Sequence, residues 1–173
     1  ISDLILEKHE AATDLLFDDD PENAERIFHE IISEAPEFCS AYNQLAVAYQ
    51  MQGQTEKARK LIEETHARFP DYFFARTALA RYKARDKQVE EARELVQPLL
   101  RLNKLHHSEF IALVRAQLEI ALADDQKEEA RIWLEMWQQI EPDNPDLLDW
   151  KVRIDGPGLL KGLKNLIGRS RDR

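Results

Sequence analysis

Apolar side chains recur along this chain at the spacing of α-helices, and short polar breaks separate the helical runs. In one stretch of the sequence, the first run contains Tyr42, Leu45 and Tyr49, which share one face of a helix. Gly53 interrupts this run, and a second helical run follows until Pro70. The pattern predicts two helices joined by a tight turn.

The same two-helix pattern returns every 34 residues. Three series of matched positions carry the repeat: an alanine in the first helix, an alanine in the second helix, and a large apolar residue one turn after the second alanine. They are Ala12, Ala46 and Ala80; Ala24, Ala58 and Ala92; and Phe28, Ile62 and Val96. A fourth unit follows a four-residue insertion and contains Leu118, Ala130, Leu134 and Pro142. Small residues at matched positions let the two helices of a hairpin approach closely.

This periodicity predicts an all-α fold, with eight main helices in antiparallel pairs over residues 5–144 and with the second-helix alanines, Ala130 included, buried. The four hairpins are expected at about 5–38, 39–72, 73–106 and 111–144. Residues 145–154 are expected to form a capping helix, because the last apolar face of a repeat stack must be covered. One domain is therefore expected over residues 1–155. We expect the aromatic-rich fourth unit to pack against the cap through Trp133, Met136, Trp137 and Trp150, and a contact with a partner is the alternative.

The third unit departs most from the pattern. Pro98 falls inside its second helix, where a proline removes a hydrogen bond and clashes with the preceding turn. The four-residue insertion follows near His106. We expect the stack to bend or loosen here, either as a tolerated irregularity or as a hinge.

These residues resemble the tetratricopeptide repeat. The second unit fits that family's pattern best, through Tyr42, Leu45-Ala46, Tyr49, Ala58, Ile62 and Pro70. The third unit departs from it, with Lys83 in place of the Tyr and Lys104 in place of the Pro. The resemblance covers roughly residues 5–144. It implies a right-handed superhelical stack of antiparallel helical hairpins, an α-solenoid, whose first helices line a concave groove that binds a peptide or a protein.

Carrying the family's groove positions onto this chain gives a set of candidate peptide-binding residues: Asn43, Val47, Gln50, Phe74, Thr77, Arg81, Arg85, Arg115 and Glu119. Arg81 and Arg85 are four residues apart and share one helix face. Arginine forks bind carboxylates with two hydrogen bonds, so the predicted ligand is a short acidic or carboxylate-terminated segment. The alternative is that these arginines pair with acidic side chains of the chain itself.

The charge of the chain is uneven. Of its 173 residues, 33 are acidic and 24 are Lys or Arg, for a net charge of −9. Residues 156–173 carry five basic side chains against Asp172, a balance of +4, so residues 1–155 sum to −13. An acidic body argues against nucleic acid as a partner, because phosphate binding needs positive charge. No apolar run approaches the roughly 18 residues of a membrane span, and a cytoplasmic protein is expected.

No signature of an enzyme, a metal site or a cofactor site stands in the sequence. A glycine-rich phosphate loop, a zinc His-Glu-x-x-His pattern and a Cys-x-x-Cys pair are all missing. Cys39 is the only cysteine and has no histidine near it in sequence. The acids Asp18, Asp19 and Asp20 are typical of a solvated turn that caps a helix. We therefore expect neither catalysis nor a cofactor.

The C-terminal segment 156–173 is basic and amphipathic. Gly156-Pro157-Gly158 breaks the capping helix, and five apolar residues then fall on one helical stripe, at 159, 160, 163, 166 and 167. Three covers for this stripe stay open: the body of the same chain, a second copy in a homodimer, and an anionic membrane. The sequence thus predicts a protein–protein interaction module, a scaffold or adaptor. A membrane-peripheral adaptor that uses residues 159–167 is the alternative.

Overall fold

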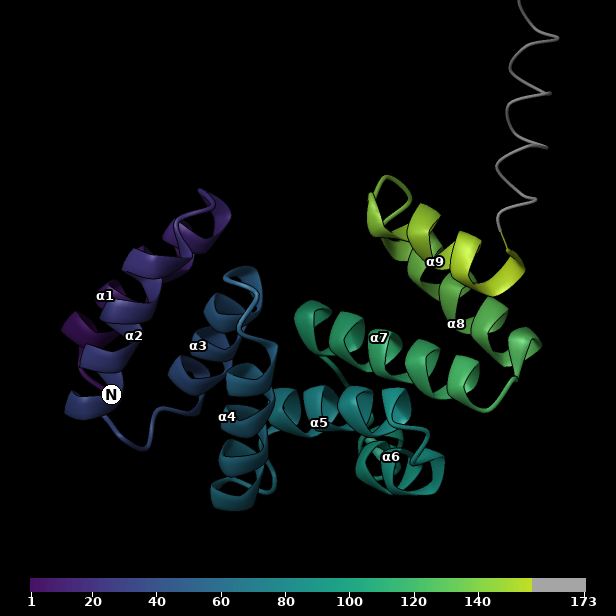
Figure 1. Ribbon diagram of the computed structural model, residues 1–173, viewed down its shortest axis with the longest axis horizontal. Helices are drawn as coiled ribbons and strands as arrows, with labels where there is room; N and C mark the ends of the chain where they lie inside the picture. Colours follow the sequence, from purple (N-terminus) through teal and green to yellow (C-terminus); the bar gives the residue numbers. More distant parts are fainter. Residues whose placement is uncertain (157–173) are drawn as a thin grey trace, which may run out of the picture. The chain divides into compact units, whose positions relative to one another are not determined.

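The computed structural model describes residues 1–156, and this part of the chain consists of helices joined by short turns (Figure 1). The helices are α1 (Asp3–Phe17), α2 (Pro21–Glu34), α3 (Cys39–Met51), α4 (Thr55–Arg68), α5 (Phe73–Arg85), α6 (Val89–Val96), the 3-10 turn η1 (Leu99–Arg101), α7 (His107–Ala123), α8 (Lys127–Ile140) and α9 (Asp146–Asp155). Residues 1–156 contain no strand. The predicted all-α fold class is confirmed. The predictions for residues 159–167 lie outside the described residues.

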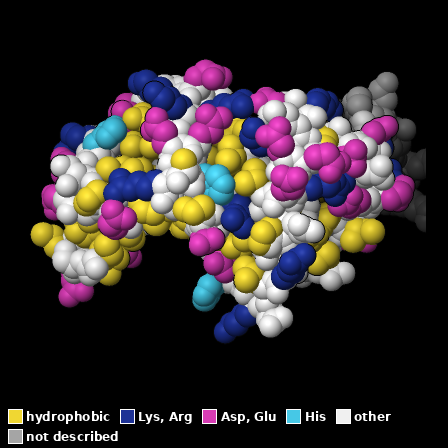
Figure 2. Space-filling view, turned by 90° about the horizontal axis from the view of Figure 1, so that it is seen from below, with side chains coloured by type: hydrophobic (Ala, Val, Ile, Leu, Met, Phe, Trp, Pro, Cys, Tyr) yellow, Lys and Arg dark blue, Asp and Glu magenta, His cyan; other side chains and the backbone are white. Residues whose placement is uncertain are grey.

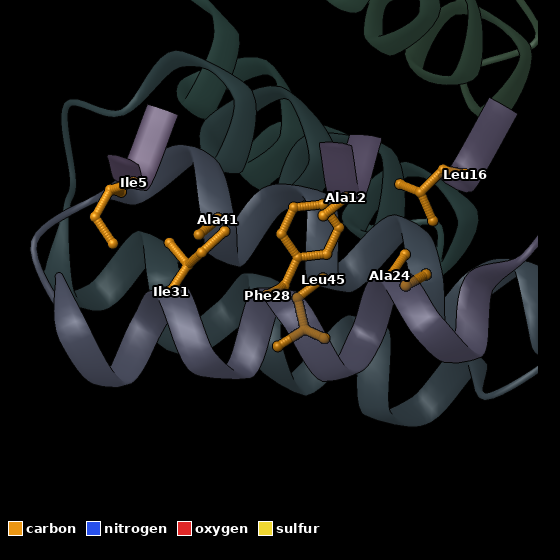
Figure 3. Close-up of a cluster of buried hydrophobic side chains, with 9 residues drawn as sticks. Ile5, Ala12, Leu16, Ala24, Phe28, Ile31, Ala41 and Leu45 are labelled. Atoms are coloured by element: carbon orange, nitrogen blue, oxygen red, sulfur yellow. The ribbon is translucent and has the colours of Figure 1, made fainter. Parts of the chain in front are cut away.

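The chain divides into two compact units, and the boundary falls within α5, between Tyr82 and Lys83. In the first unit α1 packs on α2, α2 on α3 and α3 on α4. Phe28 and Ile31 of α2 fill the space between α1 and α3, and both are fully buried. Figure 3 shows Phe28 among the small side chains that admit it, Ala12 and Ala24 included. Small and large residues thus interdigitate as the repeat predicts.

The second unit begins at Lys83 and contains α6 to α9. Here α7 packs on α6 and α8, and α9 packs on α8. Trp137 of α8 is fully buried, and Trp150 of α9 belongs to the same apolar cluster. The prediction that these two tryptophans join the last hairpin to the capping helix is confirmed. Met136, by contrast, is 39% exposed and lies at the surface.

The four second-helix alanines are completely buried, as predicted. Ala24, Ala58, Ala92 and Ala130 each have 0% exposure. A larger side chain at any of them would force apart two helices of one unit.

Each hairpin turns in the same way. One residue in every turn has a left-handed backbone, with φ of 59° at Asp19, 73° at Gly53, 63° at Lys87 and 56° at Asp125. The amide after each of these residues donates to a carbonyl five positions earlier, at 2.8–2.9 Å, and so closes the first helix. Only the second turn has glycine, the residue that adopts this conformation without strain.

The third hairpin is irregular, as its proline predicts. The second helices α2, α4 and α8 have 14 residues each, whereas α6 has eight and ends at Val96. Pro98 then leads into η1, and α7 begins only at His107. The helix stops here because Pro98 has no N–H to donate to the carbonyl four residues earlier. Whether this region acts as a hinge stays a prediction.

No helix of residues 1–156 has the length and apolarity that a membrane crossing requires.

Candidate functional site

Three of the predicted groove residues lie on α3 in the first unit. Asn43 and Val47 are half-buried, and Val47 packs against the apolar core of that unit. Gln50 is exposed, and its Nε2 donates a hydrogen bond of 2.7 Å to the hydroxyl of Tyr82 on α5. This side chain therefore joins two first helices rather than standing alone in solvent.

Three more predicted residues lie on α5 in the same unit. Phe74 is half-buried and meets the ring of Phe73 edge-on, with 5.7 Å between the ring centroids. Thr77 is only 2% exposed, and its hydroxyl donates to the carbonyl of Phe73 at 3.1 Å. Arg81 is half-buried, one turn before Arg85. Thr77 is thus buried, while Phe74 and Arg81 keep part of their surface exposed.

In the second unit, two arginines hold one buried carboxylate. The side chain of Glu119 on α7 is 3% exposed. Nη2 of Arg85 contacts its Oε1 at 2.8 Å, and Nη2 of Arg153 contacts its Oε2 at 2.6 Å. Arg85 lies at the end of α5 and Arg153 on α9, so the carboxylate connects three first helices. Both guanidinium groups stay about half exposed.

These contacts set the charge state of Glu119. Burial alone raises the pKa of a carboxyl group, but the hydrogen bonds from Arg153 and Arg85 outweigh it and hold the pKa of Glu119 below its usual value. Glu119 is therefore ionised at neutral pH. Three polar groups from separate helices become one fixed assembly, because each arginine fork satisfies a lone pair that burial would otherwise leave unpaired.

Arg115, the third predicted arginine, has other partners. Its Nη2 forms an ion pair with Asp146 at the start of α9, and its guanidinium lies over the ring of Trp137, 5.2 Å from the centroid. Arg153 stacks in the same way on Trp150, at 4.0 Å. Such stacking fixes the plane of a guanidinium and with it the direction of its donors. The structure thus joins Arg85 to Glu119 but gives Arg115 a separate carboxylate.

Sequence reasoning missed Arg153. It stands 34 residues after Glu119, at the matching position of the capping helix, so the repeat step itself was the available signal. With it, three helices contribute one partly exposed arginine each to the second unit: Arg85 from α5, Arg115 from α7 and Arg153 from α9. We call these three side chains the arginine face. On the side of the molecule that Figure 2 shows, acidic and basic side chains are interspersed.

The arginine face can bind carboxylates and has no group suited to covalent chemistry. All three side chains are permanent cations with fork geometry and cannot serve as acids or bases near neutral pH. Within residues 1–156 no three His, Cys, Asp or Glu side chains gather in a way that could hold a metal ion. The chemistry available here is recognition by hydrogen bonds and charge.

Comparison with known proteins agrees with the hairpin architecture. The family model described as tetratricopeptide repeat matches residues 15–73. A MamA RS-1 ArsTM double mutant has a similar structure, with a TM-score of 0.55 and 17% identity over 99% of this chain and 98% of that chain. A putative kinesin light chain of Podosopora anserina, with nearly identical TPR-like repeats, has a TM-score of 0.55 and 20% identity over 96% and 93%. No curated protein sequence matches the chain.

Proposed function

Because residues 15–73 match the tetratricopeptide-repeat family model and the fold resembles that of a protein with TPR-like repeats, we propose that this chain is a protein-interaction module without catalytic activity. Its ligand is a peptide segment with an acidic side chain or a free C-terminal carboxylate. The segment binds in the second unit, where the arginine face holds its carboxylate. Asn43, Gln50 and Phe74 of the first unit stay candidate contact positions from the sequence.

The observation that supports this proposal is the grip of Arg85 and Arg153 on Glu119. A carboxylate from the chain itself already sits between two arginines from separate helices, at 2.8 and 2.6 Å. The same side chains keep donors for a second carboxylate. Arg85 uses Nε and Nη2 on Glu119, and its Nη1 has no partner among the described residues. The side chains of Arg85 and Arg115 are 48% and 36% exposed, so a ligand reaches them without unfolding anything.

Fixed arginines also make binding efficient. Glu119, Asp146 and two tryptophan rings already restrain the guanidinium groups. A ligand therefore does not have to order them, and ordering a free long side chain costs about 0.5–1.5 kcal/mol. The net positive charge at Arg85 and Arg153, two arginines on one glutamate, attracts an anionic segment in a chain that is otherwise acidic.

The test uses a library of 12-residue peptides of graded acid content, each made with a free C-terminal carboxylate and with a C-terminal amide. Fluorescence polarisation measures their affinity for the full chain. The best ligands should be acidic, and binding should weaken with salt. Arg85→Gln with Arg115→Gln should lower their affinity about tenfold or more, since a hydrogen bond to a charged group contributes about 1.5–3 kcal/mol. Glu119 keeps Arg153 in this variant, which should preserve the fold.

The matched control is Arg26→Gln on α2, which removes an exposed arginine that pairs with Glu30 at the i,i+4 spacing. It should leave peptide affinity unchanged. Equal affinity of the wild type and the double variant for every bound peptide, with equal melting temperatures, would exclude the arginine face as the binding site. The same two proteins used as bait for mass spectrometry then identify the natural partner by its loss from the variant.

A further inference from the structure

A cavity of about 350 Å³ lies beside α6 in the second unit, and none of its lining residues belongs to the arginine face. Its wall comes from α6, from the turn after it and from α7. The lining residues are Glu90, Arg93, Glu94, Val96, Gln97, Leu100 and Gln117. The short α6 accounts for the space: the helix stops at Val96, and the turn that follows Pro98 leaves Leu100 49% exposed. The volume suits one long side chain and part of its backbone.

Gln117 of α7 is a polar residue at a position where the other hairpins have a buried leucine. The repeat puts Leu45 and Leu79 at the matching positions of the second and third hairpins, and both are buried there. Gln117 is just as buried, at 3% exposure, and its Oε1 accepts no hydrogen bond within the described residues. An unsatisfied amide in a core position is costly, about 1–3 kcal/mol. Rotation about its last torsion exchanges oxygen and nitrogen, so the amide can turn an acceptor toward the cavity.

The wall of the cavity is acidic. Glu90 and Glu94 are four residues apart on α6, so they share a face, and neither has an ion-pair partner among residues 1–156. Arg93 does not neutralise them, because its guanidinium already contacts Asp124 at 2.9 Å and Glu129 at 3.3 Å.

The first and second hairpins have a different charge at the position that Glu94 occupies in the third. At the position of Glu94, α2 has Arg26 and α4 has Lys60, and each pairs with a glutamate four residues later. In α6 the charge is reversed, and Pro98 replaces the partner. The same helix that is cut short thus also carries an uncompensated acid.

We propose that this cavity binds a lysine or arginine side chain presented by a partner protein. The cationic head lies between Glu90 and Glu94 and donates an N–H to the turned amide of Gln117. The alkyl stem packs on Val96 and Leu100. Lysine and arginine have a cationic donor at the end of an apolar stem. They therefore match the carboxylates, the amide acceptor and the apolar surface of the cavity. A ligand with both an acid and a base then contacts two sites in the second unit.

The test titrates the full chain, labelled with ¹⁵N, with the capped peptide acetyl-Gly-Leu-Lys-Leu-Gly-amide. The matched probe has norleucine in place of lysine, which keeps the stem and removes the charge. Amide signals of Glu94, Gln97, Leu100 and Gln117 should shift with the lysine peptide and stay with the norleucine peptide. The variant Glu90→Gln with Glu94→Gln should weaken lysine binding at least about fivefold, the equivalent of about 1 kcal/mol.

Gln117→Leu provides the second variant, because it restores the residue of the other hairpins and should fold at least as well as the wild type. It should weaken lysine binding and raise the melting temperature. Glu64→Gln on α4 is the control and should bind like the wild type. Equal binding of lysine and norleucine peptides overturns the proposal, and so does unchanged affinity in the Glu90/Glu94 variant. Shifts confined to residues outside the cavity overturn it too, whatever the fate of the arginine face.

Discussion

At the scale of single residues, Glu119 is a buried carboxylate that links three helices of the second unit. Its carboxylate is only 3% exposed, and the two arginines that bind it offset the cost of burying the charge. The folded state holds its pKa below the usual value. The sign follows directly: ionised Glu119 stabilises the fold above the pKa of the unfolded chain, and that contribution disappears as the pH falls through the lower folded pKa.

Glu119→Gln should lower the free energy of unfolding at neutral pH by about 1–3 kcal/mol, because the neutral amide offers N–H donors to arginines that need an acceptor. The difference from the wild type should shrink as the pH falls below the pKa of an ordinary glutamate, about 4.3, toward the lower pKa that Glu119 has in the folded state. Urea denaturation across this range measures it. A difference that is constant down to about pH 3 would mean that the ion pairs contribute nothing.

Single residues also show which parts of the site could be predicted from the sequence. Arg85 and Glu119 were both predicted, since the repeat assigns them to first helices. Pairing of these arginines with acids of the chain itself was the stated alternative, and it is what the structure shows for Arg85 and Arg115. The sequence did not predict which acid each arginine pairs with, because that depends on rotamers and helix packing rather than on the repeat period. Thr77 shows the same limit: its register position was right for a first helix, yet its hydroxyl bonds back to its own helix at 3.1 Å and the side chain is buried.

At the scale of elements, the four hairpin turns share one backbone geometry but differ in the residue at the left-handed position. All need one left-handed residue, and Gly53 supplies it without strain while Lys87 does not. Two matched substitutions separate backbone strain from packing. At Gly53 a Cβ would meet no atom within 4 Å, so only the backbone angle resists a side chain there.

Lys87→Gly should raise the free energy of unfolding by about 1 kcal/mol, and Gly53→Lys should lower it by a similar amount, since a left-handed residue with a Cβ costs roughly 1–2 kcal/mol. The side chain of Lys87 contributes little else, because it is exposed and, within residues 1–156, makes only a long hydrogen bond of 3.4 Å to the carbonyl of Ala123. Thermal denaturation of both variants checks the pair. If the two changes have the same sign, strain is not what distinguishes these turns.

The elements themselves were largely readable from sequence, because the alanine series and the turns are local signals. Pro98 predicted an irregular second helix, and α6 is irregular. The sequence did not predict that α6 would end at Val96 or that a cavity would open beside it. The proline forbids a hydrogen bond, but where the chain goes next depends on how Leu99 packs, and that is a tertiary contact.

At the scale of the whole molecule, the two compact units differ in their tryptophan content and can therefore be followed by different spectroscopic signals. All three tryptophans, Trp133, Trp137 and Trp150, belong to the second unit. Tryptophan fluorescence therefore follows the second unit alone, whereas far-UV circular dichroism follows helices of both. In repeat proteins, stability is close to a sum of local terms and contacts between neighbours, so local damage should stay local.

Leu45→Ala, in the core of the first unit, removes a side chain that is 2% exposed and should cost about 2–5 kcal/mol. The urea midpoint seen by circular dichroism should fall, and the midpoint seen by tryptophan fluorescence should move much less. Leu118→Ala, in the core of the second unit, serves as the reciprocal variant and should lower the fluorescence midpoint. Coincident midpoints in both variants would show that the chain unfolds as one cooperative body.

The pairing of each helix with its neighbours in sequence also has a consequence for how the protein is made. Within the first unit, the main contacts join helices that follow one another in sequence: α1 with α2, α2 with α3, and α3 with α4. Chains dominated by such local contacts fold in microseconds to milliseconds, whereas a ribosome adds about 5–20 residues each second. The first hairpins should therefore reach their native packing while the ribosome is still translating the codons for α8 and α9.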